Sequence, residues 1–245
     1  MKLKRLFALL LSLALLFSFA ACGGKEPPAE DDGKDESKDE STDEAVTSTV
    51  YLAIKDYGLV TVELYDSLAP ITVANFKKLV DEGFYDGLTF HRIIESFMIQ
   101  GGDPLGNGTG GSGQTIRGEF SQNGVDTGIK HVAGTISMAR SGHPLEGYHN
   151  AGYTNLPYEE RAPFYNSASS QFFIVTETST NNTRSLDGNY AAFGKVTEGM
   201  DIILAIASVE TDEDDKPLSP VEILVATFDK AAAQAALANG SQNNE

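Results

Sequence analysis

The stretch FHRIIESFMIQGGDPLGNGTGG, residues 90–111, carries the strongest fold signal in this 245-residue chain. It sets Arg92 and Gln100 among apolar residues and then continues into a glycine-rich segment, residues 101–115. Glycine-rich loops hold phosphate in many proteins, but this segment lacks the Lys-Ser/Thr ending of a phosphate-binding loop. We therefore interpret it as a turn-rich connection that passes close to a site.

Strand-like runs surround this stretch on both sides. TVYLAIKDYGLVTVEL, from residue 49, alternates apolar and polar residues around positions 55–58, which is the pattern of a β-hairpin with a glycine in its turn. Four further runs are HVAGTISM from His131, QFFIV from Gln171, YAAFGKV from Tyr190 and VEILVATF from Val221. Many short strands between glycine-rich turns favour a closed barrel or a sandwich over a parallel α/β sheet.

Two segments have helical features. One begins at Pro70 and stops near Gly83, with apolar residues at helical spacing: Val73, Phe76, Leu79 and Val80. The other, MDIILAIA at 200–207, is either a buried helix or a buried strand by periodicity, and the acidic residues near its start favour a helix. The tail at 231–245 is Ala-rich and then polar, which is typical of a frayed helix or of disorder.

Four separated segments together closely resemble the cyclophilin family of peptidyl-prolyl isomerases in order, spacing and most residues. They are residues 90–111, GTISMAR (134–140), SASSQFFIV (167–175) and LDGNYAAFGKVTEGM (186–200). The resemblance covers residues 49–229 and is specific, because four motifs must coincide in order. It implies a mainly β fold, a closed eight-stranded antiparallel barrel capped by two α-helices, with a peptide groove on one face and no cofactor.

The resemblance also implies roles for individual residues. Arg92 would be the catalytic cation, and the walls of a proline pocket would be Phe97, Met98, Phe173 and Leu186. The substrate chain would be held by Gln100, Gln171, Tyr190 and the backbone near Ala139 and Arg140, with Gly108 allowing close approach. Tyr190 stands where many members have His, and Arg140 where many have Asn.

The chemistry of the reaction makes these residue types sensible. Rotation about an X-Pro bond must break amide resonance, with a barrier of about 18–20 kcal/mol, and no bond is made or cleaved. A cation with several N–H donors can stabilise the twisted amide, and Arg stays charged at neutral pH. Acceleration by about 10⁵ requires roughly 7 kcal/mol, whereas one charge-assisted hydrogen bond contributes about 1.5–3 kcal/mol. Arg92 alone is therefore insufficient, and a dry apolar pocket must supply the rest.

The histidines near the site are expected to take no part in catalysis. His91 adjoins Arg92, but isomerisation transfers no proton, and strand alternation predicts that His91 points to the opposite face as a packed, hydrogen-bonded residue.

Residues 142–165 form a longer segment than family members have, read either as a substrate-selecting lip or as a tolerated surface insertion. Its His143, Glu146 and His149 are separated by helix-breaking residues, so we expect no metal site.

The N-terminus has the layout of an export signal. Basic residues precede a 16-residue apolar run at 6–21, shorter than the about 20 residues of a membrane-spanning helix. The run ends at Cys22 in a pattern similar to the lipobox of bacterial lipoproteins; the alternative is a signal cleaved elsewhere, with an incidental cysteine. We expect a signal peptide at 1–21, a lipidated Cys22 with an acidic linker to 47, an isomerase domain at 48–230 and a tail at 231–245.

The charge balance restricts the partners. The chain carries a formal net charge of −17 and no stripe of Lys and Arg, which argues against nucleic acid. We expect a monomeric enzyme that acts on proline-containing segments of exported polypeptides and is anchored outside the cytoplasm by lipid on Cys22. The main rival is a non-catalytic proline-binding module or chaperone, against which Arg92 argues. A hydrolase is disfavoured, because the sequence contains no nucleophile elbow and no credible triad.

Overall fold

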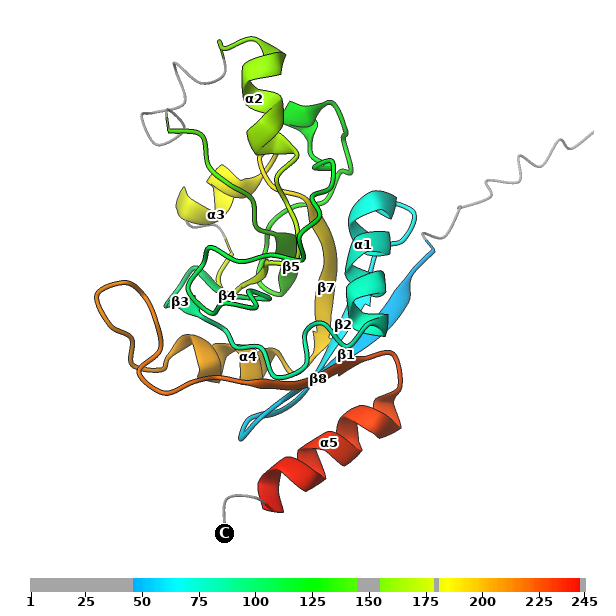
Figure 1. Ribbon diagram of the computed structural model, residues 1–245, viewed down its shortest axis with the longest axis vertical. Helices are drawn as coiled ribbons and strands as arrows, with labels where there is room; N and C mark the ends of the chain where they lie inside the picture. Colours follow the sequence, from blue (N-terminus) through cyan, green and yellow to red (C-terminus); the bar gives the residue numbers. More distant parts are fainter. Residues whose placement is uncertain (1–45, 145–154, 179–180, 243–245) are drawn as a thin grey trace, which may run out of the picture. The chain divides into compact units, whose positions relative to one another are not determined.

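The computed structural model of the chain describes residues 46–144, 155–178 and 181–242 (Figure 1). The predicted signal peptide, Cys22 and most of the acidic linker lie outside these residues. The described part contains eight strands: β1 (Ser48–Ile54), β2 (Gly58–Leu64), β3 (Arg92–Ile94), β4 (Met98–Gly101), β5 (Thr135–Met138), β6 (Phe172–Val175), β7 (Ala192–Glu198) and β8 (Ile223–Thr227). Its helices are α1 (Pro70–Asp81), α2 (Tyr158–Tyr165), α3 (Asn181–Leu186), α4 (Met200–Ala207) and α5 (Lys230–Gln242).

The strands form one curled antiparallel sheet in the order β3-β4-β6-β5-β7-β2-β1-β8, which confirms the predicted eight-stranded antiparallel architecture. The sheet is a half-barrel rather than a fully laddered barrel, because its edge strands β3 and β8 do not pair with each other. The residues just before these strands approach instead. Thr89 and Glu222 form an isolated antiparallel bridge, and the Phe90 N–H donates to the Val221 carbonyl at 2.9 Å.

Strand register sorts the residues of β3, β4, β6 and β5 onto two faces. Opposite one another across these strands lie four buried isoleucines, Ile93, Ile99, Ile174 and Ile136. The neighbouring row, on the other face, is Arg92, Gln100, Phe173 and Ser137. Because side chains alternate along a strand, burying the isoleucines in the core sends Arg92 to the outer face.

The sequence predicted the two helices that flank the sheet. Pro70 begins α1, and Phe76 packs on three aromatic rings with centroid distances of 5.0–5.7 Å: Tyr85, Phe172 and Phe193. Residues 200–207 form a helix, α4, and not a strand. None of the helices in the described ranges is both long and apolar enough to cross a membrane.

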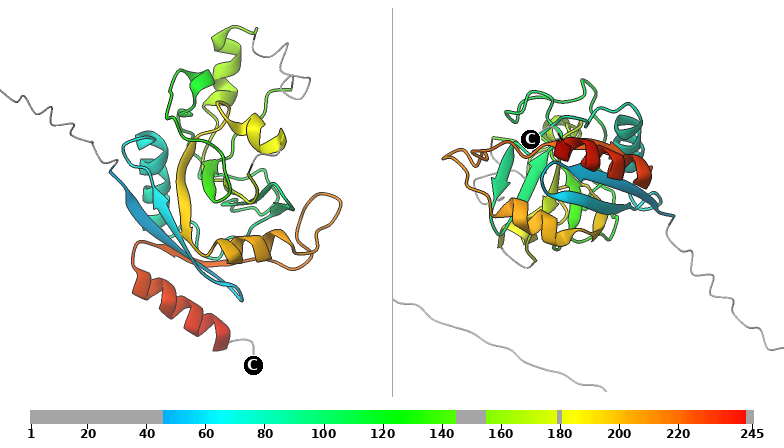
Figure 2. Two further views of the ribbon diagram at one scale, coloured as in Figure 1. Left: turned by 180° about the vertical axis from the view of Figure 1, so that it is seen from behind. Right: turned by 90° about the horizontal axis from the view of Figure 1, so that it is seen from below.

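Other expectations are corrected. Residues 131–134 were expected to begin a strand, but they form a turn, in which the Thr135 N–H donates to the Val132 carbonyl at 2.9 Å. Besides the two predicted capping helices, which are observed, the described part contains three further α-helices, α2, α3 and α5, and a short 3-10 helix at Ser121–Asn123. For the tail, helix rather than disorder is observed: α5 lies across β1 and β8 (Figure 2), and Asp229 caps its first turn by accepting from the Ala231 N–H at 2.8 Å.

Helix α1 is held at its N-terminus by a buried carboxylate from a distant loop. Glu119, only 3% exposed, accepts from the Ile71 N–H at 3.2 Å, the Thr72 N–H at 2.7 Å and the Thr72 hydroxyl at 2.7 Å. The first N–H groups of a helix lack partners within the helix and carry partial positive charge. Glu119 therefore fastens α1 to the segment that follows the glycine-rich loop.

We expect Glu119→Ala to lower the free energy of unfolding by about 2–3 kcal/mol, because it leaves buried donors without an acceptor. Urea unfolding of the purified protein measures the change. Glu82→Ala, at the exposed C-terminal end of the same helix, is the matched control and should change stability by less than about 0.5 kcal/mol. Equal effects of the two substitutions would contradict the capping role.

Candidate active site

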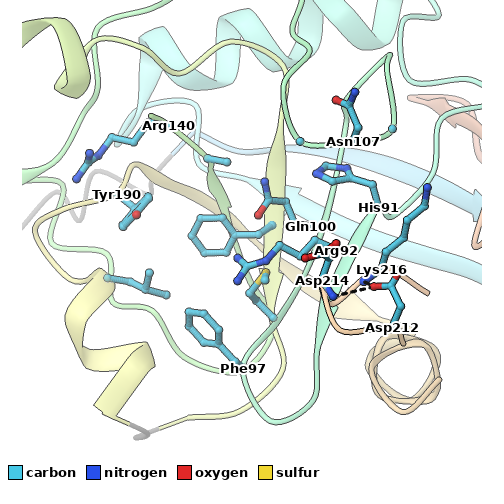
Figure 3. Close-up of a pocket in the computed structure, with 16 residues that line it drawn as sticks. His91, Arg92, Phe97, Gln100, Asn107, Arg140, Tyr190, Asp212, Asp214 and Lys216 are labelled. Atoms are coloured by element: carbon cyan, nitrogen blue, oxygen red, sulfur yellow. Dashed lines mark hydrogen bonds between the residues drawn. The ribbon is translucent and has the colours of Figure 1, made fainter. Parts of the chain in front are cut away.

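A cavity of about 500 Å³ lies on the outer face of β3, β4 and β6 (Figure 3). It brings together every predicted catalytic and substrate-binding residue except Gln171. The lining is His91, Arg92, Phe97, Met98, Gln100, Gly106, Asn107, Gly108, Ala139, Arg140, Phe173, Leu186, Tyr190, Asp212, Asp214 and Lys216. These residues lie on or next to β3, β4, β5 and β6, in the glycine-rich loop, in α3 and the turn that follows it, and in the loop before β8.

One wall of the cavity is apolar and separate from the barrel core. Met98, Phe173 and Leu186 are buried in it, and three partly buried residues pack on them: Phe97, Ala139 and Tyr190. The Phe173 and Tyr190 rings meet edge to face, with centroids 5.7 Å apart. Surface of this kind excludes water from a small hydrophobic ring placed against it.

Arg92 lies beside this wall as an exposed side chain on β3. Its Nε donates to Asp215 Oδ2 at 3.2 Å, and its Nη2 lies 3.1 Å from the same oxygen. Sequence reasoning missed Asp215. The only signal was the acidic run ETDEDD at 210–215, and nothing in the spacing relates position 215 to a strand 123 residues earlier.

Gln100 and Gln171 act as a pair. The Gln100 side-chain amide donates to Gln171 Oε1 at 2.8 Å, and the Gln171 amide donates to the carbonyls of Gly108, at 3.1 Å, and Gly110, at 2.7 Å. Gln171 itself lines a neighbouring cavity of about 520 Å³ rather than the one with Arg92. Its observed contacts fix Gln100 and the glycine-rich loop.

Asp103 organises the glycine-rich loop. Its carboxylate, in a residue only 1% exposed, accepts from the backbone N–H groups of Leu105 at 2.8 Å, Asn107 at 3.0 Å and Gly108 at 2.6 Å. Burial alone would raise the pKa of this carboxyl, but these N–H groups outweigh it and lower the pKa below 3.8. A Cβ at Gly110 would collide with Asp103 Oδ1, so glycine is required there. Sequence reasoning identified the loop but not this acceptor at its centre.

A buried polar chain lies behind Phe173. Asp187 Oδ1 is 3.0 Å from His131 Nδ1, and His131 Nε2 is 3.1 Å from the Ser137 hydroxyl. The His131 ring stacks on Phe173 with centroids 6.1 Å apart. The order of contacts is that of a hydrolase triad, but Ser137 is fully buried and no substrate can reach it. The chain therefore supports the pocket wall and cannot attack a substrate.

His91 differs from expectation. It is packed, as predicted, but it lines the same cavity as Arg92, with its ring directed toward Asn107 (Figure 3). Neither ring nitrogen has a hydrogen-bond partner among the described residues. The prediction of a hydrogen-bonded His91 on the opposite face was wrong, because β3 begins only at Arg92 and regular alternation does not extend back to residue 91.

The segment 142–165 contacts the site through Arg140. The Arg140 guanidinium lies over the rings of Tyr190 at 4.7 Å, Tyr165 at 5.3 Å and Phe120 at 5.6 Å, and its Nε donates to the Asn189 carbonyl at 2.8 Å. Tyr165 is the buried last residue of α2 and so belongs to the segment. The end of α2 is therefore packed against Arg140, which lines the cavity, whereas a loose surface loop would make no such contact.

Residues 145–154, including Glu146 and His149, lie outside the described residues. The His143 ring packs on Phe164 with centroids 4.7 Å apart. Within the described ranges, no group of three or more His, Cys, Asp or Glu residues is placed to hold a metal ion.

Residues 49–228 match the family model described as cyclophilin type peptidyl-prolyl cis-trans isomerase/CLD. The chain is 41% identical over 170 residues to peptidyl-prolyl cis-trans isomerase-like 1 of Neurospora crassa, covering 69% of this chain and 87% of that one. It is 42% identical over 153 residues to peptidyl-prolyl cis-trans isomerase B of Bacillus subtilis, covering 62% and 86%.

Among solved structures, the fold is similar to a cyclophilin type peptidyl-prolyl cis-trans isomerase of Cryptosporidium parvum, crystallised in the presence of the dipeptide Ala-Pro. The TM-score is 0.59 at 28% identity, and the similarity covers 75% of this chain and 99% of that one. Similarity in sequence and in structure therefore coincides over the domain that contains the cavity.

The two buried histidines predict how stability depends on pH. Burial lowers the pKa of both His91 and His131 below 6.5, because desolvation disfavours the charged ring. The folded state then binds protons less tightly than the unfolded state. The free energy of unfolding should fall as pH drops from about 6.5 through the folded-state pKa values, by up to about 1.4 kcal/mol per pH unit for each histidine.

Urea unfolding at pH 7, 6 and 5 measures this dependence. The double substitution His91→Gln and His131→Gln should flatten the pH dependence of stability. Thr183→Val, which removes a buried hydroxyl but no titrating group, should lower stability and leave its pH dependence unchanged. An unchanged pH dependence in the double variant would contradict the assignment to these histidines.

Proposed function

This chain belongs to the family of cyclophilin-type peptidyl-prolyl cis-trans isomerases and is an enzyme of that class, and from this premise we propose that Arg92 drives X-Pro rotation in exported proteins. The observation that carries the proposal is the cavity in which Arg92 lies beside the apolar wall of Met98, Phe173 and Leu186. Binding of a proline ring needs only the wall. The adjoining cation adds a group suited to the twisted amide.

Substrate binding is proposed to begin with the proline ring against the apolar wall. The relative from Cryptosporidium parvum was crystallised in the presence of Ala-Pro, the smallest peptide that contains an X-Pro bond, which supports proline-containing segments as ligands here. Gln100 lies opposite both Arg92 and Phe173 in the strand register. We propose that its amide, which is hydrogen-bonded to Gln171, contacts the backbone of a bound peptide beside the proline.

Catalysis then consists of preferring the twisted amide to the planar one. As the bond turns, the proline nitrogen regains its lone pair and can accept a hydrogen bond from the Arg92 guanidinium. The pocket holds the ring while the acyl side rotates, and it removes water that stabilises the planar form. No proton is transferred and no covalent intermediate forms. Arg92 supplies about 1.5–3 of the roughly 7 kcal/mol that a 10⁵-fold acceleration needs.

We also propose that the enzyme acts outside the cytoplasm, on exported proteins, as a lipoprotein. The support is the sequence of the first 47 residues: a basic start, an apolar run too short to span a membrane, Cys22 after two alanines, and a linker of ten acidic residues against three lysines. Segments with so few apolar residues and such an excess of like charges typically serve as spacers. The linker would hold the domain away from the membrane.

We expect Arg92→Ala to lower kcat/KM for cis-to-trans isomerisation of a short X-Pro peptide by about 10- to 100-fold, the loss of one charge-assisted hydrogen bond in the transition state. The kcat/KM of Arg92→Lys should lie between that of Arg92→Ala and that of the wild type, because Lys keeps the charge but loses the planar fork. Arg184→Ala removes an exposed Arg that does not line the cavity and should leave the rate unchanged. Equal rates for Arg92→Ala and the wild type would refute the mechanism.

Lipidation is tested by expressing the full chain in a bacterium that processes lipoproteins. The wild type should incorporate radiolabelled palmitate and sediment with membranes, and Cys22→Ser should do neither, because the thiol is the attachment point. Arg92→Ala should behave as the wild type in this assay. A wild-type chain that stays unlabelled and soluble would rule out the anchor without affecting the isomerase assignment.

A further inference from the structure

Arg92 pairs with the carboxylate of Asp215 along one edge of its guanidinium. Nε and Nη2 of Arg92 both lie within hydrogen-bonding distance of Asp215 Oδ2, at 3.2 and 3.1 Å. Within the described ranges of the chain, the guanidinium makes no further hydrogen bond. Since Arg has five N–H donors in a rigid plane, fixing the Nε edge determines where the opposite edge, with Nη1, points.

Asp215 is itself fixed relative to β3. Its carbonyl accepts from the Ile93 N–H at 2.8 Å, one residue beyond Arg92, and its own N–H donates to the Asp212 carbonyl at 3.2 Å. The Asp212 carboxylate closes the turn by accepting from the N–H groups of Asp214 at 3.0 Å and Lys216 at 2.9 Å. The Asp215 carboxylate is therefore presented to Arg92 from a backbone that is hydrogen-bonded to the strand carrying Arg92.

The backbone at Asp215 also restricts which residues fit there. Its φ is +63°, in the left-handed region that Asn, Asp and Gly tolerate best. Among these three, Asp alone adds a charged acceptor for Arg92, and Asn offers a neutral one. The Arg92 and Asp215 side chains are 44% and 40% exposed, so the ion pair is screened and adds little to stability. Because the ion pair contributes little to stability, its main effect is to orient the Arg92 guanidinium.

We propose that Asp215 is a positioning residue for the isomerase reaction: it holds the Nε edge of Arg92 so that the Nη1 edge faces the apolar wall where the X-Pro bond turns. This inference rests on the proposed role of Arg92. Without Asp215 the long Arg92 side chain would have to be ordered in each catalytic cycle, which lowers kcat. Because Asp215 does not contact the substrate, KM should change little.

Two substitutions at position 215 separate the effect of the side-chain acceptor from the effect of the left-handed backbone conformation. Asp215→Asn keeps both the left-handed conformation and an oxygen that accepts from Nε, and should retain kcat within about twofold. Asp215→Gly keeps the conformation but removes the acceptor, and should lower kcat by about two- to fivefold, the size of an exposed ion pair, with KM nearly unchanged. Glu213→Gln removes an equal charge from the same loop, away from the cavity lining, and should match the wild type.

A double variant tests whether Asp215 acts through Arg92. In an Arg92→Ala background, Asp215→Gly should have no further effect on kcat. The Arg92 Nε–H signal in NMR gives a second readout: it should be protected from exchange in the wild type and in Asp215→Asn, and should lose protection in Asp215→Gly. Thermal unfolding of each variant shows whether it is folded.

The outcomes are distinct. Wild-type kcat in Asp215→Gly, with a strong loss in Arg92→Ala, would overturn the positioning role and leave the proposed function standing. A further loss from Asp215→Gly in the Arg92→Ala background would also overturn it, since Asp215 would then act by another route. Wild-type activity of Arg92→Ala would refute the proposed function and this inference together.

Discussion

The site depends on the register of one strand row. Ile93, Ile99, Ile174 and Ile136 lie opposite one another in the core, and burying them fixes the pairing of β3, β4, β6 and β5. A slip of one residue would place Arg92 and Gln100 in the core and expose the isoleucines, burying a charge with no partner. The hydrophobic effect that folds the sheet thus also fixes which groups line the cavity. The geometry of the candidate site and the packing of the core therefore have the same cause.

Most of the cavity rim is formed by loops, so strand pairing cannot fix its conformation, and polar side chains hold it in place instead. Buried or partly buried carboxylates hold the loops by accepting from several donors each: Asp103 in the glycine-rich loop, Glu119 at the start of α1, and Asp187 below His131. An unpaired carboxylate in such a place would be costly to bury, whereas hydrogen bonds from two or three donors compensate for much of that cost. This explains why a loop with many glycines can still present Asn107 and Gly108 in fixed positions beside Arg92.

The sequence predicted much of this arrangement, and what it missed has a common physical character. Alternation and helical spacing predicted the hairpin, α1 and most strands, and of the eleven site residues that motif resemblance predicted, ten line the cavity. Neither kind of signal identified Asp215, Asp103 or the Arg140 contact with Tyr165. Each of these is a contact between a side chain and a partner that is distant in sequence or lies in an irregular loop, and neither periodicity nor propensity carries information about such contacts. His91 was misjudged for a related reason, since alternation was applied one residue before the strand begins.

The proposed mechanism links the electrostatic strength of Arg92 to the binding of substrate. At 44% exposure the charge of Arg92 is screened by water as well as by Asp215, so its field at the cavity wall is small. A peptide whose proline covers Met98 and Phe173 removes part of that water and lowers the local dielectric constant. In the proposed mechanism, the guanidinium would then gain interaction energy at the stage when the amide nitrogen begins to develop a lone pair. In the proposed mechanism, substrate burial and the strength of the cation are therefore coupled, and neither the apolar wall nor Arg92 would account for the rate without the other.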